Sequence, residues 1–233
     1  MKNFSNTYIY TFSIVMVVIV ALLLSLAAIQ LKPFQDKNIE EEKKQNILSS
    51  VGIASTPVDA VDLYAKYITE SFILNNKGEK QEGDAFVIEL KSELGKPASE
   101  RKLPVFVATL DDGGKAFVVP LRGKGLWGPI WGYISLKPDL NTIYGTIFDH
   151  QGETPGLGAE IATDWFQEPF KGKQIFQDST QFVSVKVLKG GAPDDDPHAV
   201  DAISGGTITS KALEAMLDTC LVQYKTYFLT NRQ

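Results

Sequence analysis

The chain has 233 residues, a formal net charge of −5 at neutral pH and one cysteine. This length accommodates one membrane segment and one domain of ordinary size. The mild acidity, without a basic stripe of interleaved aromatic rings, argues against nucleic acid as a partner. The lone Cys220 excludes an intramolecular disulfide and a cysteine cluster for zinc or iron–sulfur, and we interpret it as a buried structural thiol.

The segment from Tyr8 to Ile29 contains no charged residue over 22 positions. A helix of that length spans about 33 Å, which is enough to cross the hydrocarbon core of a bilayer. A cleaved signal peptide is the alternative, but its apolar region is typically ~7–15 residues long and follows a more basic start than Lys2 provides. We therefore predict a retained transmembrane anchor over residues 1–31 and a polar stalk over residues 32–56.

The charges around the anchor leave its orientation open. One lysine precedes the apolar segment, and those that follow it are Lys32, Lys37, Lys43 and Lys44. A simple count of positive charges places the following domain in the cytoplasm. However, residues 40–42 are all glutamate, and long domains translocate largely regardless of charge.

Residues 57–233 have the pattern of one α+β domain with a mainly antiparallel sheet and flanking helices. A helix with one apolar stripe is predicted over 58–73. Two strand pairs are predicted, the first joined by the turn residues Asp-Asp-Gly-Gly at 111–114. In chain order, the strands are expected at 85–90, 103–110, 116–121, 130–136, 142–148 and 182–188, with helices at 160–166 and 210–230.

Three segments of this domain carry candidate functional residues. The first is Gly-Leu-Trp-Gly-Pro-Ile-Trp-Gly-Tyr at 125–133, where glycines alternate with large aromatic side chains. Flat rings such as Trp127 can wall a planar cofactor and exclude water. The alternative is a turn whose aromatic side chains fill the core.

The second segment is Glu-Thr-Pro-Gly-Leu-Gly at 153–158. Its proline and glycines favour a tight turn. Such a turn can aim backbone N–H groups, the Thr154 hydroxyl and the Leu157 side chain at one face of a ligand. A plain surface turn is the alternative.

The third segment runs from Asp201 to Ser210 and reads Asp-Ala-Ile-Ser-Gly-Gly-Thr-Ile-Thr-Ser before a helical pattern. Glycines let the backbone approach a bulky anion, and a helix N-terminus offers free N–H groups and a positive dipole end. The segment therefore suits a phosphate, which could be joined to a hydroxyl. The alternative is an ordinary loop in which Thr209 or Ser210 caps the helix. No βαβ unit precedes these glycines and no lysine follows them, which excludes Rossmann and P-loop interpretations.

These three segments, in this order and behind an anchor, resemble the covalent FMN-binding domain family, and in particular the members found in sodium-translocating NADH:quinone reductases. The resemblance implies that Asp201 is the leading acid of the attachment motif and that Thr207 forms a phosphodiester with FMN. Gly206 stands where the family usually has alanine, a difference that we expect to be tolerated. The other residues that the resemblance places at the cofactor are Ser204, Gly205, Thr209, Glu153, Thr154, Leu157, Gly158 and Trp127.

Within this resemblance, Thr154 is expected to hydrogen-bond the isoalloxazine ring and Leu157 to pack on it. Lys189 ends the strand before the attachment segment. A cation near the flavin N1 atom would favour the reduced, anionic flavin. A solvated lysine at a strand end is the alternative for Lys189.

The resemblance implies an electron-transfer subunit that relays electrons between redox subunits of a membrane complex and is inactive alone. It implies a separate flavin transferase that attaches FMN from FAD, and a domain on the outer face of the bacterial cytoplasmic membrane. That orientation conflicts with the simple charge count, and we follow the resemblance. Two alternatives remain: the equivalent flavin-bearing subunit of the related Rnf ferredoxin:NAD oxidoreductase, and a membrane-tethered binding module without a redox group.

Overall fold

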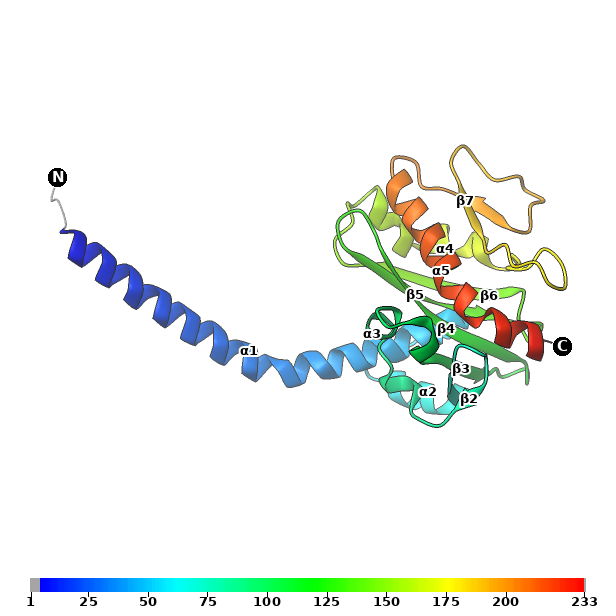
Figure 1. Cartoon of the computed structure of the whole chain (residues 1–233), viewed down its shortest axis with the longest axis horizontal. Coiled ribbons are helices and arrows are strands. Elements are labelled where there is room, and N and C mark those ends of the chain that lie inside the picture. Colours follow the sequence, from blue (N-terminus) through cyan, green and yellow to red (C-terminus); the bar gives the residue numbers. More distant parts are fainter. Residues whose placement is uncertain (1–4, 233) are drawn as a thin grey trace. The chain divides into compact units, whose positions relative to one another are not determined.

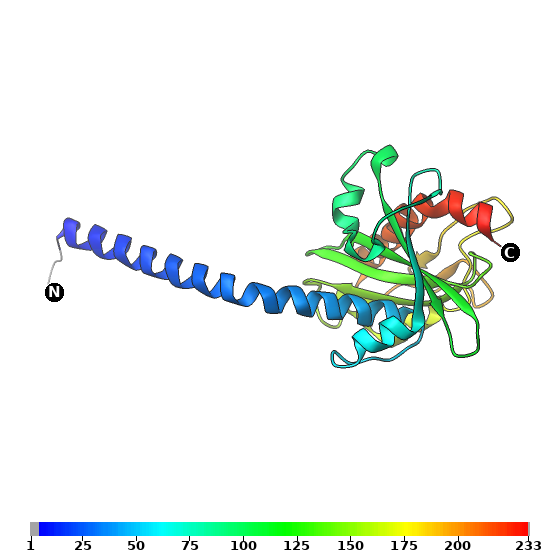
Figure 2. The same cartoon turned by 90° about the horizontal axis from the view of Figure 1, so that it is seen from below.

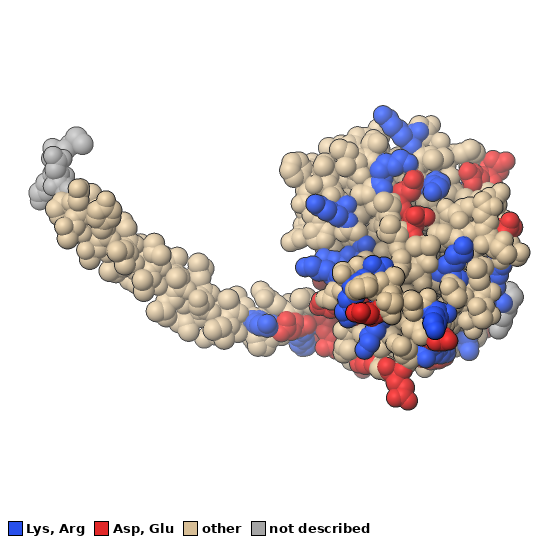
Figure 3. Space-filling view, viewed as in Figure 1, with Lys and Arg blue, Asp and Glu red and all other residues tan. Residues whose placement is uncertain are grey.

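The computed structural model describes residues 5–232 (Figure 1). Helix α1, Asn6–Ser50, contains both the apolar segment and the polar stalk, and Pro33 lies inside it. Its most apolar window has a mean hydropathy of 3.0, and within residues 5–232 it is the one helix long and apolar enough to cross a membrane. Figure 3 shows that charged side chains begin only in the second half of this helix.

The chain packs as two units, one up to Lys43 and a compact one from Lys44 onward. The last turns of α1 belong to the compact unit, where Ile47 and Val51 are buried. Gln45 also donates a hydrogen bond to the carbonyl oxygen of Ser55, which follows the helix. The packed unit therefore begins inside α1 rather than after it.

A six-stranded sheet of order β2-β1-β3-β4-β5-β6 forms the centre of the compact unit. All its neighbouring strands are antiparallel, as predicted. In Figure 2, helix α5, Thr207–Asn231, lies on one side of the sheet and the end of α1 with α2 on the other. The strands are β1 Ile68–Leu74, β2 Lys80–Gln81, β3 Leu103–Thr109, β4 Lys115–Lys124, β5 Pro129–Leu136 and β6 Ile143–His150.

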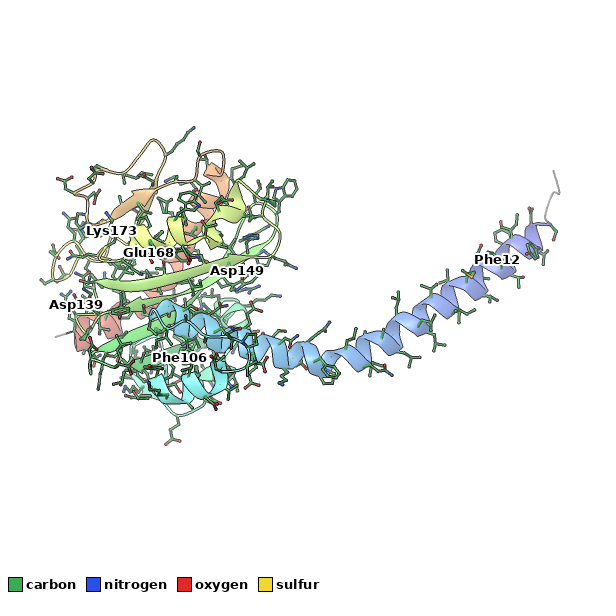
Figure 4. The ribbon with its side chains drawn as sticks, turned by 180° about the vertical axis from the view of Figure 1, so that it is seen from behind. Phe12, Phe106, Asp139, Asp149, Glu168 and Lys173 are labelled. Atoms are coloured by element: carbon green, nitrogen blue, oxygen red, sulfur yellow. The ribbon has the colours of Figure 1, made fainter. Side chains whose placement is uncertain are left out.

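Both predicted hairpins of this sheet are confirmed. In the β3–β4 turn, the N–H of Leu110 donates to the carbonyl of Gly114 at 2.8 Å. In the β5–β6 turn, the carboxylate of Asp139, labelled in Figure 4, accepts hydrogen bonds from the backbone N–H groups of Asn141 and Thr142. A short acidic side chain that bonds to N–H groups two and three residues ahead stabilises a tight turn.

The strands bury side chains on both faces because successive residues point to opposite sides. In β3, Val105 and Val107 join the cluster under α5, whereas Phe106 and Ala108 join a smaller cluster that includes Ile47 of α1. The ring of Phe106, labelled in Figure 4, is completely buried there. The candidate functional site lies on the α5 side of the sheet.

Helix α5 begins three residues earlier than the predicted start at 210. Gly206 is its N-cap, and no side chain caps it. The alternative with Thr209 or Ser210 as the cap is therefore wrong. Instead, both are buried in the first turn, and the Ser210 hydroxyl accepts a hydrogen bond from the N–H of Ile203. Farther along α5, Cys220 is buried, as expected.

Two predictions near the start of the domain are wrong. The region 58–73 is not one helix, because α2, Ala60–Tyr67, ends where β1 begins and pairs with β3. The β-branched residues of 68–73 favour that strand. The region 85–90 is not a strand but a 3₁₀ turn, η1 Ala85–Val87, followed by α3 Leu90–Leu94. The Asp84 carboxylate accepts from the N–H of Phe86, which stabilises the turn locally.

Two later predictions hold only in part. The helix expected at 160–166 is divided at Thr163, whose backbone is extended. The strand expected at 182–188 is formed only over Lys186–Leu188, because Ser184 has a positive φ of 59° that interrupts it. This strand, β7, pairs in parallel with β8, Ala199–Asp201, which the pattern did not predict. The remaining short turns are η2 Ala98–Glu100, η3 Gly158–Ala162, α4 Asp164–Gln167 and η4 Glu168–Phe170.

Candidate functional site

A pocket of about 290 Å³ lies at the beginning of α5. It is formed where the loop before β5, the loop after β6 and the start of α5 meet. These are the three segments, 125–133, 153–158 and 201–210, that were predicted from the sequence to carry functional residues. The residues lining it are Leu126, Glu153, Thr154, Leu157, Gly158, Gly205, Gly206, Thr207, Ile208 and Thr209.

The glycines before α5 allow this close approach. Gly205 has a φ of +76°, and a Cβ atom there would lie 2.6 Å from Cδ2 of Leu157. At Gly206 a Cβ would lie 2.9 Å from Cγ2 of Ile203, so alanine, usual in the resembling family, fits here only if Ile203 shifts. Because Gly206 offers no side-chain cap, the first N–H groups of α5 remain able to bind an anion.

The two threonines of the first turn differ in their surroundings. Thr209 is 2% exposed, and its hydroxyl donates to Oε2 of Glu153 at 2.5 Å. Thr207 is the first helical residue and is only partly buried. Among residues 5–232, no partner forms a hydrogen bond with the Thr207 hydroxyl. Of the two threonine hydroxyls in the first turn, the described residues therefore leave only that of Thr207 without a partner.

The loop 153–158 turns back tightly on itself. The carbonyl of Thr154 accepts hydrogen bonds from the N–H groups of Leu157 and Ala159. Gly156 has a φ of +73°, and its N–H donates to Oε1 of Glu160. This turn presents Leu157, which is 41% exposed, at the pocket, a position that suits the expected apolar contact with a ring.

Glu153 lies under the pocket with only 4% of its surface exposed. Its Oε1 accepts from the backbone N–H of Trp127 at 2.9 Å, in addition to the bond from Thr209 to Oε2. Burial alone would raise the pKa of this carboxyl. The hydrogen bonds from Thr209, Trp127 and Leu126 outweigh burial and lower the pKa below the ordinary value, so Glu153 is ionised at neutral pH.

The aromatic segment 125–133 matches the core-filling alternative at Tyr133, which is buried in the smaller apolar cluster, but it matches neither sequence-based interpretation at Trp127. Trp127 is 69% exposed, so it does not fill the core, and its side chain is not among those lining the pocket. Its neighbour Leu126 lines the pocket instead, as does Ile208 from α5. Neither Leu126 nor Ile208 was predicted as a site residue from the sequence. The sequence feature that could have identified them is an apolar side chain at a position outside the expected core: Leu126 follows a glycine, and Ile208 lies in the first turn of a helix.

Three further predicted site residues, in addition to Trp127, lie outside the pocket lining. Lys189 follows β7, and Ser204 is exposed just before Gly205. Asp201 ends β8, and its Oδ1 accepts from the N–H of Ala192 at 2.6 Å. Asp201 therefore stabilises the glycine-containing loop that precedes β8 and does not itself line the pocket.

The pocket combines a free hydroxyl, an uncapped helix start and apolar side chains on more than one side. The first two features suit a phosphate, and the apolar side chains of Leu126, Leu157 and Ile208 suit a flat ring. Within residues 5–232, no group of three or more acidic, histidine or cysteine side chains could hold a metal ion. These features together fit a cofactor that carries both a planar ring and a phosphate.

The comparisons with known proteins agree with this geometry. The model of the FMN-binding domain family matches residues 125–222, which include all three segments. NqrC, a component of the Na(+)-translocating NADH-quinone reductase, from Vibrio anguillarum is 31% identical over 214 residues, covering 85% of this chain and 83% of that protein. NqrC from Haemophilus ducreyi is also 31% identical, covering 88% and 85%.

Solved structures show the same similarity. The crystal structure of NqrC from Parabacteroides distasonis is 47% identical, with a TM-score of 0.78 over 87% of this chain and 98% of that one. NqrC from Shewanella oneidensis is 28% identical, with a TM-score of 0.70 over 82% of this chain and 96% of that one. The chain therefore belongs to the NqrC family, whose members are subunits of the Na(+)-translocating NADH-quinone reductase, an oxidoreductase complex.

Proposed function

We propose that this protein is an electron-transfer subunit that carries one FMN, bound through a phosphodiester to Thr207. The observation that supports it most directly is the contrast between the two threonines of the first turn. Thr207 presents a hydroxyl without a hydrogen-bond partner among the described residues, whereas Thr209 is buried and bonded to Glu153. The family model that matches residues 125–222 supplies FMN as the ligand.

The attachment reaction needs a flavin transferase and FAD as co-reactant. Oγ1 of Thr207 attacks the phosphorus on the flavin side of the FAD pyrophosphate and loses its proton. A new bond forms between oxygen and phosphorus, the pyrophosphate bond breaks and AMP leaves. The N–H groups at the start of α5 stabilise the negative charge on the phosphate oxygens.

The remaining residues of the pocket orient the ring. The Thr154 hydroxyl and the backbone of its loop donate hydrogen bonds, and Leu157 with Leu126 provides apolar contact and excludes water. Lys189 acts from outside the lining as a cation that favours the reduced ring. When bound, FMN supplies electron-transfer chemistry that no side chain of the pocket can perform.

The protein works as one member of a multi-subunit membrane complex. It receives electrons from one redox subunit and passes them to the next, and α1 anchors it in the membrane. The domain lies on the outer face of the cytoplasmic membrane. A fusion of alkaline phosphatase to the C-terminus should therefore be active in cells, and an inactive fusion that is stably made would contradict this orientation.

The attachment is tested by co-expression of the full chain with a flavin transferase, followed by intact-mass measurement and a denaturing gel under ultraviolet light. The wild type should gain the mass of FMN less one water and fluoresce in the gel. Thr207→Val should lose both signals. The control Thr230→Val, near the exposed C-terminal end of α5, should retain them. A wild-type chain without added mass would instead support a binding module without a redox group.

A further inference from the structure

One buried carboxylate connects the three segments that form the pocket. Oε1 of Glu153 accepts from the N–H of Trp127 in the loop before β5, and Oε2 accepts from the Thr209 hydroxyl in α5. Glu153 itself begins the loop 153–158, and its own N–H donates to Nδ1 of His150 at 3.2 Å. The partners of this single side chain lie 26 and 56 residues away along the chain.

The surrounding backbone leaves space for the Glu153 carboxylate and little more. A Cβ atom at Gly125 would lie 2.5 Å from Oε1, and one at Gly158 would lie 2.5 Å from Oε2. Among residues 5–232, no lysine or arginine forms an ion pair with Glu153. Its charge is stabilised mainly by N–H and O–H donors, with a smaller contribution from His150, and each donor is important because a buried ion without partners is costly.

We propose that Glu153 is a positioning residue that fixes the start of α5 against both loops, and that its bond to Thr209 sets where the Thr207 hydroxyl is presented. This inference rests on the proposed attachment of FMN at Thr207. Thr209 lies two residues after Thr207 in the same first turn, so holding Thr209 holds the turn. Without the bond, the Thr207 hydroxyl samples positions from which it cannot attack a phosphorus in line.

The same carboxylate contributes a negative charge to the lining of the pocket. A fixed negative charge opposes the addition of electrons to a nearby ring. Glu153 therefore lowers the reduction potential of a flavin held in this pocket. Neutralising Glu153 should therefore raise the reduction potential of the flavin. A substitution that only destabilises the fold, without removing this charge, should leave the potential unchanged.

The first test measures the rate of FMN attachment to full-length variants by intact mass, with purified flavin transferase and FAD. Thr209→Val removes the donor while keeping the shape, and should slow attachment about tenfold or more, as expected for loss of a hydrogen bond to a charged group. Thr209→Ser keeps a hydroxyl and should restore most of the rate. If Thr209→Val reacts as fast as the wild type, the positioning role is wrong.

The second test compares Glu153→Gln with Glu93→Gln. Glu93 is also buried and hydrogen-bonded, to Lys96 and the N–H of Lys102, but it lies on α3 and does not line the pocket. Both variants should be less stable to heat, but only Glu153→Gln should slow attachment and raise the midpoint potential of the attached flavin. Equal effects of the two variants on rate and potential would overturn the proposal.

These outcomes remain separate from failure of the proposed function. If the wild type gains no FMN, the attachment at Thr207 is wrong. If the wild type is fully modified while Glu153→Gln and Thr209→Val match it in rate and in flavin potential, the attachment stands and the positioning role alone is wrong.

Discussion

The two faces of the six-stranded sheet are covered in different ways. On one face, ten residues of α5 are buried, and eight of them belong to a large apolar cluster that also contains Phe148, Phe166 and Phe170. On the other face, the last turns of α1, the short helix α2 and the 3₁₀ turn η1 cover the sheet, and the apolar cluster is smaller. The first face supports the pocket and the second holds the end of the anchor helix.

On the face covered by the end of α1, a polar contact stabilises the structure in addition to apolar packing. The Ser135 hydroxyl bonds to the carbonyl oxygens of Ser50, at the end of α1, and Gly145 in β6. A side chain at Gly145 would prevent this approach, since its Cβ would lie 2.5 Å from the Ser50 oxygen. The candidate site is thus built on the face with the larger core, while the connection to the anchor helix depends on a few specific contacts.

The largest expected effects on stability come from truncating a buried apolar side chain on either face of the sheet. Leu213 in α5 and Ile47 in α1 are both completely buried, so Leu213→Ala and Ile47→Ala should each destabilise the domain by about 2–5 kcal/mol. Only Leu213→Ala should also slow FMN attachment, because Leu213 supports the first turns of α5. Chemical unfolding in detergent and the attachment assay measure the two effects. Equal slowing by Ile47→Ala would contradict the division of roles between the faces.

A smaller effect is expected from Ser135→Ala. The change leaves two buried carbonyl oxygens without their shared donor, which costs about 1–3 kcal/mol. The loss should concentrate at the end of α1, so hydrogen exchange should increase near Ser50 while protection in α5 stays unchanged. Thr142→Ala, which removes a hydroxyl bonded to Asp139 in the β5–β6 turn, serves as the control. If Ser135→Ala leaves exchange near Ser50 unchanged, packing alone holds the anchor there.

The sheet was more predictable from the sequence than the site. Strands β3 to β6 follow from alternation and turn residues, such as the Asp-Asp-Gly-Gly at 111–114, because both signals are local. The segment 201–210, which we propose carries the FMN, was identified from its glycines and its resemblance. What local signals could not give is the bond between Glu153 and Thr209, because it depends on how distant segments pack. For the same reason, β1 was mistaken for helix, since its identity comes from pairing with β3.

The smallest expected effect is the dependence of the domain's stability on the charge of Glu153 at acidic pH. The pKa of Glu153 lies below its ordinary value of 4.5, because hydrogen bonds from Thr209 and two N–H groups outweigh burial. A carboxyl whose pKa is lowered by folding contributes stability that is complete above the unfolded pKa and is lost as the pH falls through the folded pKa. His150, which accepts from the Glu153 N–H, is the neighbouring titratable group.

The free energy of unfolding of the wild type should therefore exceed that of Glu153→Gln at neutral pH, and the gap should narrow as the pH falls below about 4.5. The narrowing reflects a single carboxyl whose pKa is lowered by folding. Denaturant unfolding of the wild type and of Glu153→Gln, measured from neutral to acidic pH, gives this difference. The contributions of other acidic groups are the same in both proteins and cancel. A gap that stays constant into acid would mean that Glu153 holds the pocket together by shape alone, without its charge.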